Sequence, residues 1–155
     1  MLDSAGRLIG INTAIYSPSG ASAGIGFAVP VDTVMRVVPQ IIRNGKYISP
    51  SLGIEVNEAI NQRLVSILQV QGVVVLKVIA GSSAEKAGLR SITVYRDGRI
   101  TPGDVIVEIA GKKIDTVGKL QAKLDNFKIG DKVKVTILRE GKRMEVDLVL
   151  QPNTN

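Results

Sequence analysis

In the first 30 residues, apolar side chains recur at alternate positions. In residues 7–15, β-forming Ile and Thr side chains recur at every second position, which is typical of a strand with one buried face. Residues 24–30 form a second run of β-formers that ends at Pro30, a residue with no N–H to give to a sheet. Residues 17–24 between them are rich in Ser and Gly. The segment therefore predicts a hairpin closed by a turn-forming loop.

A helical period follows this hairpin. Five aliphatic residues recur at steps of three and four, which predicts an amphipathic helix that Val31 or Asp32 caps and Gly45 ends. Pro39 lies inside this helix. Because Pro has no N–H and its ring crowds the preceding turn, we expect a kink or a break there.

The pattern changes again near residue 48, where an Ile-Ser-Pro-Ser stretch precedes a longer region dominated by strands. We therefore expect two domains, residues 1–49 and 50–155. Apolar or alternating runs predict strands at 72–78, 105–109, 112–114, 132–139 and 143–150. Residues 90–101 are expected to be an irregular insertion with a surface turn.

Two helices are predicted between these strands. Ser82 and Glu85 have the spacing of a capping box, and Gly88 ends the short helix that they begin. The second helix starts near Val117 and is capped by Asp115 or Thr116. Its apolar residues fall on one face, with charged residues outside that face.

Composition limits the chemistry that the chain can perform. The net charge is +6, but only 3% of the residues are aromatic, and the charges are interspersed. We therefore expect a solvated basic surface and no nucleic-acid partner. With no His and no Cys, the chain alone cannot assemble a Ser-His-Asp triad, a disulfide or a thiolate metal site. We expect no metal and no cofactor.

Neither a transmembrane segment nor a signal peptide is expected. The longest nearly uncharged stretch, residues 8–31, is interrupted by Asn, Thr, Ser and Gly, whereas a spanning helix needs about 20 mainly apolar residues. The N-terminal residues lack the charged and apolar regions of a signal peptide. Any targeting sequence is expected to be absent or already removed.

Three motifs in residues 50–155 resemble, in type and order, those of PDZ domains of the HtrA (Deg) family of serine endopeptidases. They are Ser51-Leu52-Gly53-Ile54, the Ser-Ser-Ala-Glu-Lys-Ala-Gly-Leu run from Ser82, and Pro102-Gly103-Asp104. Upstream, Gly-Ile-Asn-Thr at 10–13 and Gly-Ile-Gly-Phe-Ala at 24–28 resemble the last strands of the family's trypsin-like domain. The resemblance implies a mainly β fold with α-helices (α+β). It comprises a PDZ-like, partly open β-barrel with two helices, preceded by a β-hairpin and a helix left from a trypsin-like barrel.

For residues 50–155 the resemblance implies a peptide-binding site. The N–H groups of Leu52, Gly53 and Ile54 would bind a C-terminal carboxylate, and Ile54, Glu55 and Val56 would pair with the peptide strand. Gly suits this loop because it tolerates tight turns and close approach. Ser51 stands where PDZ domains commonly have a Gly. Leu120 and Leu124 would shape a pocket for an apolar terminal side chain, and core packing is the alternative for both.

For residues 1–49 the resemblance implies a remnant of a protease domain. Asn12, Thr13 and Ala14 correspond to residues near the primary specificity pocket, and without the rest of the barrel we expect them to line no pocket. The family's Gly-Asn-Ser-Gly-Gly-Pro nucleophile motif is not in this chain, so no catalytic residue is assigned. Ser4 lies in a turn and has no imidazole to activate it.

Two functions from different classes follow. The first is a C-terminal-peptide-binding PDZ module of an HtrA-like endopeptidase in protein quality control, with unfolded or misfolded proteins as partners and a homo-oligomer through the parent protease domain. The second is a stand-alone PDZ adaptor that uses residues 1–49 for self-association. The resemblance favours an extracytoplasmic location: periplasm, cell envelope or organelle lumen.

Overall fold

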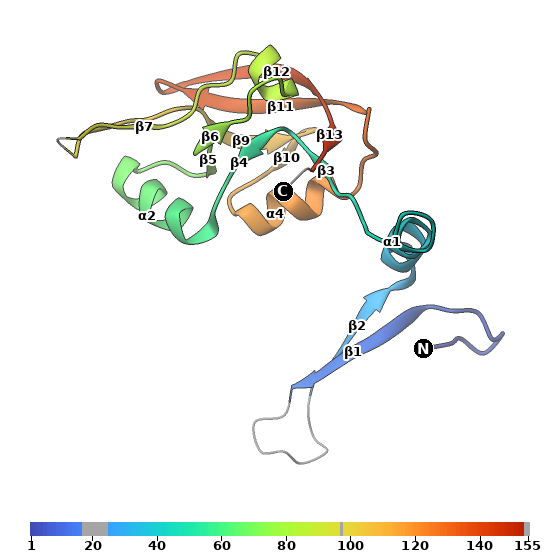
Figure 1. Ribbon diagram of the computed structural model, residues 1–155. Coiled ribbons are helices and arrows are strands. Elements are labelled where there is room, and N and C mark those ends of the chain that lie inside the picture. Colours follow the sequence, from blue (N-terminus) through green and yellow to red (C-terminus); the bar gives the residue numbers. More distant parts are fainter. Residues whose placement is uncertain (17–24, 97, 154–155) are drawn as a thin grey trace. The chain divides into compact units, whose positions relative to one another are not determined.

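The chain forms two compact units, Met1–Ile48 and Ser49–Asn155. The computed structural model describes residues 1–16, 25–96 and 98–153 (Figure 1). The loop predicted at 17–24 lies outside these residues.

The first unit contains the predicted hairpin. Strand β1 (Gly10–Tyr16) pairs antiparallel with β2 (Ile25–Pro30), and the register shifts at Thr13 as in a β-bulge. β1 starts three residues later than predicted because Arg7 belongs to a turn. The Asp3 carboxylate accepts hydrogen bonds from the N–H and the guanidinium Nε of Arg7 at 2.9 and 2.7 Å.

Helix α1 (Val31–Asn44) follows β2 directly. Its N-cap is the extended residue Pro30, without a side-chain cap, so the predicted caps Val31 and Asp32 are wrong and both lie in the first turn. Gly45 ends the helix as predicted, with a φ of 72° and its N–H bonded to the carbonyl of Ile41 at 2.8 Å. The helix continues through Pro39 without a break.

The second unit is built from short antiparallel strands around one long hairpin. Its strands are β3 (Pro50–Ser51), β4 (Ile54–Glu55), β5 (Val73–Val74), β6 (Lys77–Val78), β7 (Thr93–Val94), β8 (Ile100–Thr101), β9 (Val105–Ile109), β10 (Lys112–Lys113), β11 (Lys132–Arg139), β12 (Lys142–Val149) and β13 (Gln151–Pro152). The main sheet has the order β10-β9-β11-β12, with β5 also paired to β9. The pairs β13-β3, β4-β6 and β7-β8 complete the unit.

Three helices belong to this unit, one more than predicted. They are α2 (Glu58–Leu68), α3 (Ser83–Lys86) and α4 (Val117–Leu124). Figure 1 shows the β11-β12 hairpin on one side of the unit and α2 and α4 on the other. Helix α2 is the addition, and the cap that starts it is Asn57, whose side chain accepts the N–H of Ile60 at 3.0 Å.

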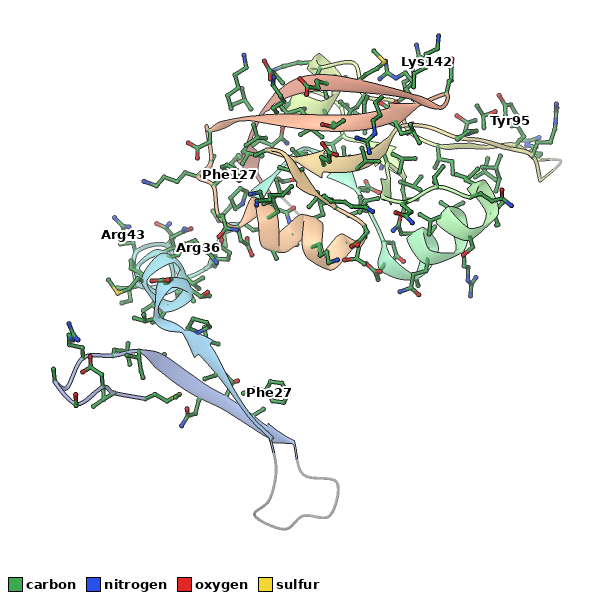
Figure 2. The ribbon with its side chains drawn as sticks, turned by 180° about the vertical axis from the view of Figure 1, so that it is seen from behind. Phe27, Arg36, Arg43, Tyr95, Phe127 and Lys142 are labelled. Carbon is green, nitrogen blue, oxygen red and sulfur yellow. The ribbon has the colours of Figure 1, made fainter. Side chains whose placement is uncertain are left out.

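The strand predicted at 72–78 is divided into β5 and β6. The division occurs because the backbone changes hydrogen-bond partners there. The N–H of Val75 donates to the backbone carbonyl of Asp104, whereas the N–H of Leu76 donates to the backbone carbonyl of Glu55. Residues 90–101 are also more regular than predicted, since β7 and β8 make a small hairpin. Tyr95 extends from this hairpin, with the Arg99 guanidinium 5.4 Å from its ring centre (Figure 2).

Aliphatic side chains form two cores in the second unit. The larger one lies between the sheet, α3 and α4, and includes Leu52, Ile106 and Ile137. The smaller one lies under α2, where Leu64 packs with residues of β5 and β9. Helix α2 thus buries a face of the sheet that the predicted two-helix arrangement leaves uncovered.

Candidate functional site: a groove between β4 and α4

A groove with a volume of about 540 Å³ lies between the β3-β4 segment and helix α4. Seven of the eight residues predicted for the peptide site line it: Ser51, Leu52, Ile54, Glu55, Val56, Leu120 and Leu124. Residues separated by about 70 positions in the sequence are therefore brought together. The eighth, Gly53, lies in the loop that forms one end of the groove and is not among its lining residues.

The backbone of Gly53 has the left-handed conformation, with a φ of 81°. A side chain at this position would be strained, and its Cβ would approach the Cβ of Ser82 to 2.4 Å. Ser82 caps α3, so the loop packs directly against the start of that helix. Gly53 is therefore required by packing inside the domain, before any ligand is considered.

Most backbone polar groups of the loop already have hydrogen-bond partners inside the domain. The carbonyls of Leu52 and Gly53 are occupied, because they accept the N–H groups of Ala84 and Ile79 at 3.2 and 3.0 Å. The N–H of Gly53 is also occupied, since it donates to the Ser51 hydroxyl at 3.0 Å. Within the described residues the N–H of Leu52 has no hydrogen-bond partner. Leu52 and Ser51 both line the groove, so the Leu52 N–H is the loop donor that is left for a ligand there.

Among the described residues, strand β4 pairs only with β6, so its other edge has no strand partner. The carbonyls of Gly53 and Glu55 accept N–H groups from Ile79 and Leu76, on the side of β6. Successive residues of a strand direct their backbone groups to opposite edges, so the N–H and C=O of Ile54 face away from β6 and toward the groove. An extended segment placed in the groove can add to β4 as a further strand.

The opposite wall of the groove is helix α4. Leu120 and Leu124 are each only 3% exposed and belong to the larger core, yet both also line the groove. Both side chains therefore pack in the core and also line the groove, because they lie at the boundary between the two. The Thr116 hydroxyl caps the helix by accepting the N–H of Lys119 at 3.1 Å.

Six further residues line the groove and were not predicted: Asn57, Ile60, Leu76, Val117, Gln121 and Asn153. Two of them come from the start of α2, the helix missing from the sequence prediction. The signal that could have found them is Asn57 in front of Glu58, a frequent pairing at helix N-termini.

Glu58 connects α2 to the wall of the groove. One carboxylate oxygen, Oε2, accepts the N–H of Val117 at 2.8 Å, although the two residues are 59 positions apart. The other oxygen accepts the side-chain amide of Gln62 at 3.2 Å. Val117 is the first residue of α4, so the carboxylate lies at the positive end of the helix dipole.

Apolar and polar residues line the groove together, and Glu55 is the charged residue among them. Its carboxylate is 2.9 Å from the ammonium group of Lys77, in a pair with both side chains well exposed. In the part of the chain that the structure describes, no cluster of acidic residues could hold a metal ion. No helix among the described residues is long and apolar enough to cross a membrane.

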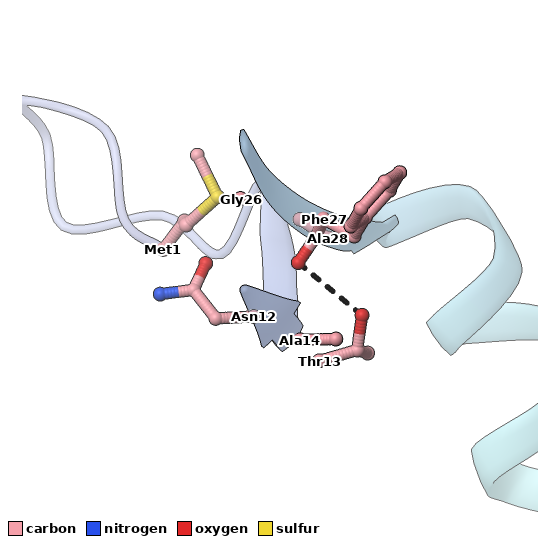
Figure 3. A pocket seen from close by; sticks show the side chains of 7 residues that line it. All are labelled: Met1, Asn12, Thr13, Ala14, Gly26, Phe27 and Ala28. Atoms are coloured by element: carbon pink, nitrogen blue, oxygen red, sulfur yellow. Dashed lines mark hydrogen bonds between the residues drawn. The ribbon is translucent and has the colours of Figure 1, made fainter. Parts of the chain in front are cut away.

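The residues that the resemblance relates to a protease specificity pocket line a hollow in the first unit. Asn12, Thr13 and Ala14 of β1 line it together with Phe27 of β2, and its volume is about 680 Å³. We expected these residues to line no pocket, but they line this hollow. All four side chains are exposed to solvent. The Thr13 hydroxyl donates to the carbonyl of Phe27 at 3.2 Å (Figure 3).

A glycine loop leads into a strand edge that faces a helix across the groove, and comparison with known proteins identifies the class of domain. The family model for the PDZ domain matches residues 50–150. The chain belongs to the PDZ domain family.

Relatives extend the similarity to nearly the whole chain. The chloroplastic Protease Do-like 1 of Arabidopsis thaliana is 44% identical over 98% of this chain and 34% of its own length. The periplasmic serine endoprotease DegP of Escherichia coli K12 is 36% identical over 96% of this chain and 30% of its own length. The chain thus spans about a third of the curated relatives that it matches.

A solved structure of the HtrA-type protease AlgW with a decapeptide matches with a TM-score of 0.62 and 31% sequence identity. The match covers 99% of this chain and 44% of that protein. The similarity to HtrA-type proteases inferred from the motifs is therefore confirmed, both in sequence and in fold.

Proposed function

We propose that residues 49–155 bind the free C-terminus of a polypeptide in the groove between β4 and α4. The observation that carries this proposal is the free edge of β4 facing α4, with the Leu52 N–H unpaired at the end of the groove. Backbone N–H groups that converge at a turn are suited to a carboxylate. The peptide would add to β4 as an antiparallel strand, with its carboxylate at the Ser51–Ile54 loop.

The aliphatic side chains of the groove favour apolar residues in the bound segment. Leu120 and Leu124 would contact the terminal side chain, and Ile54 and Val56 would flank the strand from β4. Burying one aliphatic side chain contributes about 1.5–3 kcal/mol, which is enough to distinguish apolar from polar ends. Exposed apolar C-termini are characteristic of unfolded or misfolded chains, which are the proposed partners.

We further propose that the chain is part of an HtrA-type serine endopeptidase that acts in protein quality control. Residues 1–48 would be the end of its protease domain, and Asn12, Thr13 and Ala14 would lie by its specificity pocket. The relatives named periplasmic and chloroplastic support an extracytoplasmic or organellar location. Peptide capture by the PDZ domain would then bring substrates to the protease or regulate it.

A second candidate rests on apolar side chains exposed in the first unit. Phe27 is 55% exposed (Figure 2), and Ile42 is 77% exposed. In the first proposal the rest of a protease domain covers such residues. In the second, the chain is a stand-alone adaptor and a second copy covers them. Sedimentation velocity of the 155-residue chain separates the two, because only self-association makes its mass depend on concentration.

The peptide proposal is tested by calorimetry with a free and an amidated peptide. We choose acetyl-Gly-Ser-Ala-Val-Ala-Leu with a free carboxylate, and the same sequence with a C-terminal amide. The amide removes the charge that the loop recognises, so we expect the free acid to bind at least tenfold more tightly. Equal binding of the two forms, or binding of neither, would show that the groove is not a C-terminal-peptide site.

A further inference from the structure

The hydrogen bond between Glu58 and Val117 lies at a defined end of the groove. Glu58 follows β4 after only two residues, and its contact with Val117 places the start of α4 beside the end of β4. The other end of α4, at Leu124, therefore lies toward the loop at residues 51–53, where β4 begins. The strand and the helix run in opposite directions along the two walls.

These directions relate positions in a bound peptide to positions on α4. Leu120 and Leu124 would both contact the last side chain of the peptide, so the middle of that contact lies about five residues along the helix from Val117, or about 7.5 Å. Two steps of an extended strand, at about 3.3 Å each, cover nearly this distance, and side chains two positions apart point to the same face. The third residue from the end of the peptide therefore lies close to Val117. The Glu58 bond thus lies behind the wall that this third residue would contact.

The first turn of α4 depends on few external bonds. Thr116 satisfies the N–H of Lys119 with its hydroxyl, and the N–H of Leu120 bonds to the carbonyl of Thr116. The N–H of Val117 receives its partner from outside the helix, from Glu58. Gly118 is exposed and, with no Cβ, contributes little packing of its own. The position of Val117 is therefore controlled by a residue that is not among those that line the groove.

We propose that Glu58 is a positioning residue that sets the selectivity of the groove for the third residue from a peptide's C-terminus. The inference rests on the proposed peptide site and deepens it. The carboxylate fixes Val117 through its N–H, and Val117 in turn presents an apolar surface to the peptide. Removing Glu58 releases the first turn of α4 while Leu120 and Leu124 remain held in the core.

The test uses the full chain, two Glu58 variants and three hexapeptides with free carboxylates. The reference peptide is acetyl-Gly-Ser-Ala-Val-Ala-Leu. One variant peptide has Ala in place of Val at the third position from the end, and the other has Ala in place of the terminal Leu. Glu58→Ala removes the carboxylate, whereas Glu58→Gln retains an oxygen that can accept the Val117 N–H. Glu140→Ala, on an exposed turn with its own partner Arg90, is the matched control.

For the wild type we expect each Ala substitution in the peptide to weaken binding about five- to tenfold. The reason is that Ala keeps only part of the apolar contact that the larger aliphatic side chain makes when it is buried. In Glu58→Ala the discrimination between Val and Ala at the third position should fall below about twofold. Discrimination at the terminal position should be unchanged. Glu58→Gln should lie between the wild type and Glu58→Ala, and Glu140→Ala should match the wild type. A merely structural role would weaken all three peptides alike.

Hydrogen exchange of the Val117 amide gives a second measurement that requires no peptide. We expect faster exchange in Glu58→Ala, with the amides of the central sheet unchanged. Equal losses at both peptide positions, or unchanged discrimination together with unchanged exchange at Val117, would overturn the role of Glu58. If the wild type binds none of the peptides, the proposed peptide site fails and this inference fails with it.

Discussion

The ion pair between Asp104 and Arg139 is expected to be a principal stabiliser of the second unit. Asp104 is completely buried, and both of its carboxylate oxygens accept hydrogen bonds from Arg139, from Nε and Nη2, at 2.7 Å each. Nη2 also donates to the carbonyl of Gly88 at 2.7 Å. Replacing Arg139 by Met removes all three bonds, and among the described residues the carboxylate then keeps the N–H of Arg90, at 2.8 Å.

The size of the effect follows from the burial of the pair. Removing one partner of a buried ion pair costs about 3–5 kcal/mol, because an uncompensated charge remains. The Arg139 side chain is 17% exposed, so we expect a loss near the lower limit, about 3 kcal/mol. Hydrogen bonding to Asp104 also raises the pKa of Arg139. The stabilisation from this raised pKa is fully present below the unfolded pKa of arginine and is lost only as the pH rises through the folded pKa, so alkaline titration does not break the pair under ordinary conditions.

Urea unfolding, followed through the NMR signals of Ile106 and Ile137 in the core, measures this loss. With an m-value of about 1.5 kcal/mol/M, a loss of 3 kcal/mol lowers the midpoint by about 2 M. Arg143→Met is the matched control, because its pair with Glu108 is largely exposed and should contribute less than about 1 kcal/mol.

Two outcomes would refute the reasoning on the buried pair. One is an Arg139→Met variant that loses no more stability than Arg143→Met. The other is a failure of Asp104→Asn to recover stability in the Arg139→Met background, since removing the unpaired charge should restore part of the loss.

Three further predictions concern single contacts. Ser51→Ala frees the Gly53 N–H from its hydroxyl partner, so calorimetry should show the free-acid peptide binding about fivefold more tightly, a gain of about 1 kcal/mol. Asn61→Ala leaves a carbonyl and an N–H at β5 buried without partners, and urea unfolding should show a loss of about 2–4 kcal/mol. The side-chain hydrogen bond from Lys119 lowers the pKa of Asp115. This stabilisation is present above about pH 3.9 and is lost as the pH falls through the folded pKa, and carboxyl NMR titration should show the lowered value.

Each of these predictions has its own control. The amidated peptide should bind Ser51→Ala and the wild type equally, and a parallel gain would point to a general change in the groove. Gln62→Ala, on the exposed face of α2, should change the free energy of unfolding by less than about 0.5 kcal/mol. A loss as large as that of Asn61→Ala would show that the buried hydrogen bonds of Asn61 are not the cause of its effect. In Lys119→Met the pKa of Asp115 should return toward its ordinary value, and a value that stays low would exclude Lys119 as its cause.

Local patterns in the sequence predicted the structure correctly where hydrogen bonds between neighbouring residues determine it. Ser82 caps α3 by accepting the N–H of Glu85 at 3.2 Å, as predicted. Glu85 bonds back to the N–H of Gly81 at 2.7 Å rather than to that of Ser82, a variation of one residue on the expected capping box. Thr116, one of the two predicted caps of α4, has that role, and Gly45 ends α1. These groups lie within a few positions of one another, so their spacing alone specifies the bonds.

The groove and its supports were decided by contacts between distant residues. Helix α2 escaped prediction because its polar surface and short apolar pattern give a weak period, whereas packing of Leu64 on the sheet stabilises it. The requirement for Gly at position 53 comes from Ser82, and the start of α4 is held by Glu58. Sequence motifs indicated that a strand and a helix form the site. Which atoms face the groove depends on how β4, α2 and α4 pack, because burial and hydrogen bonding are satisfied only by the assembled domain.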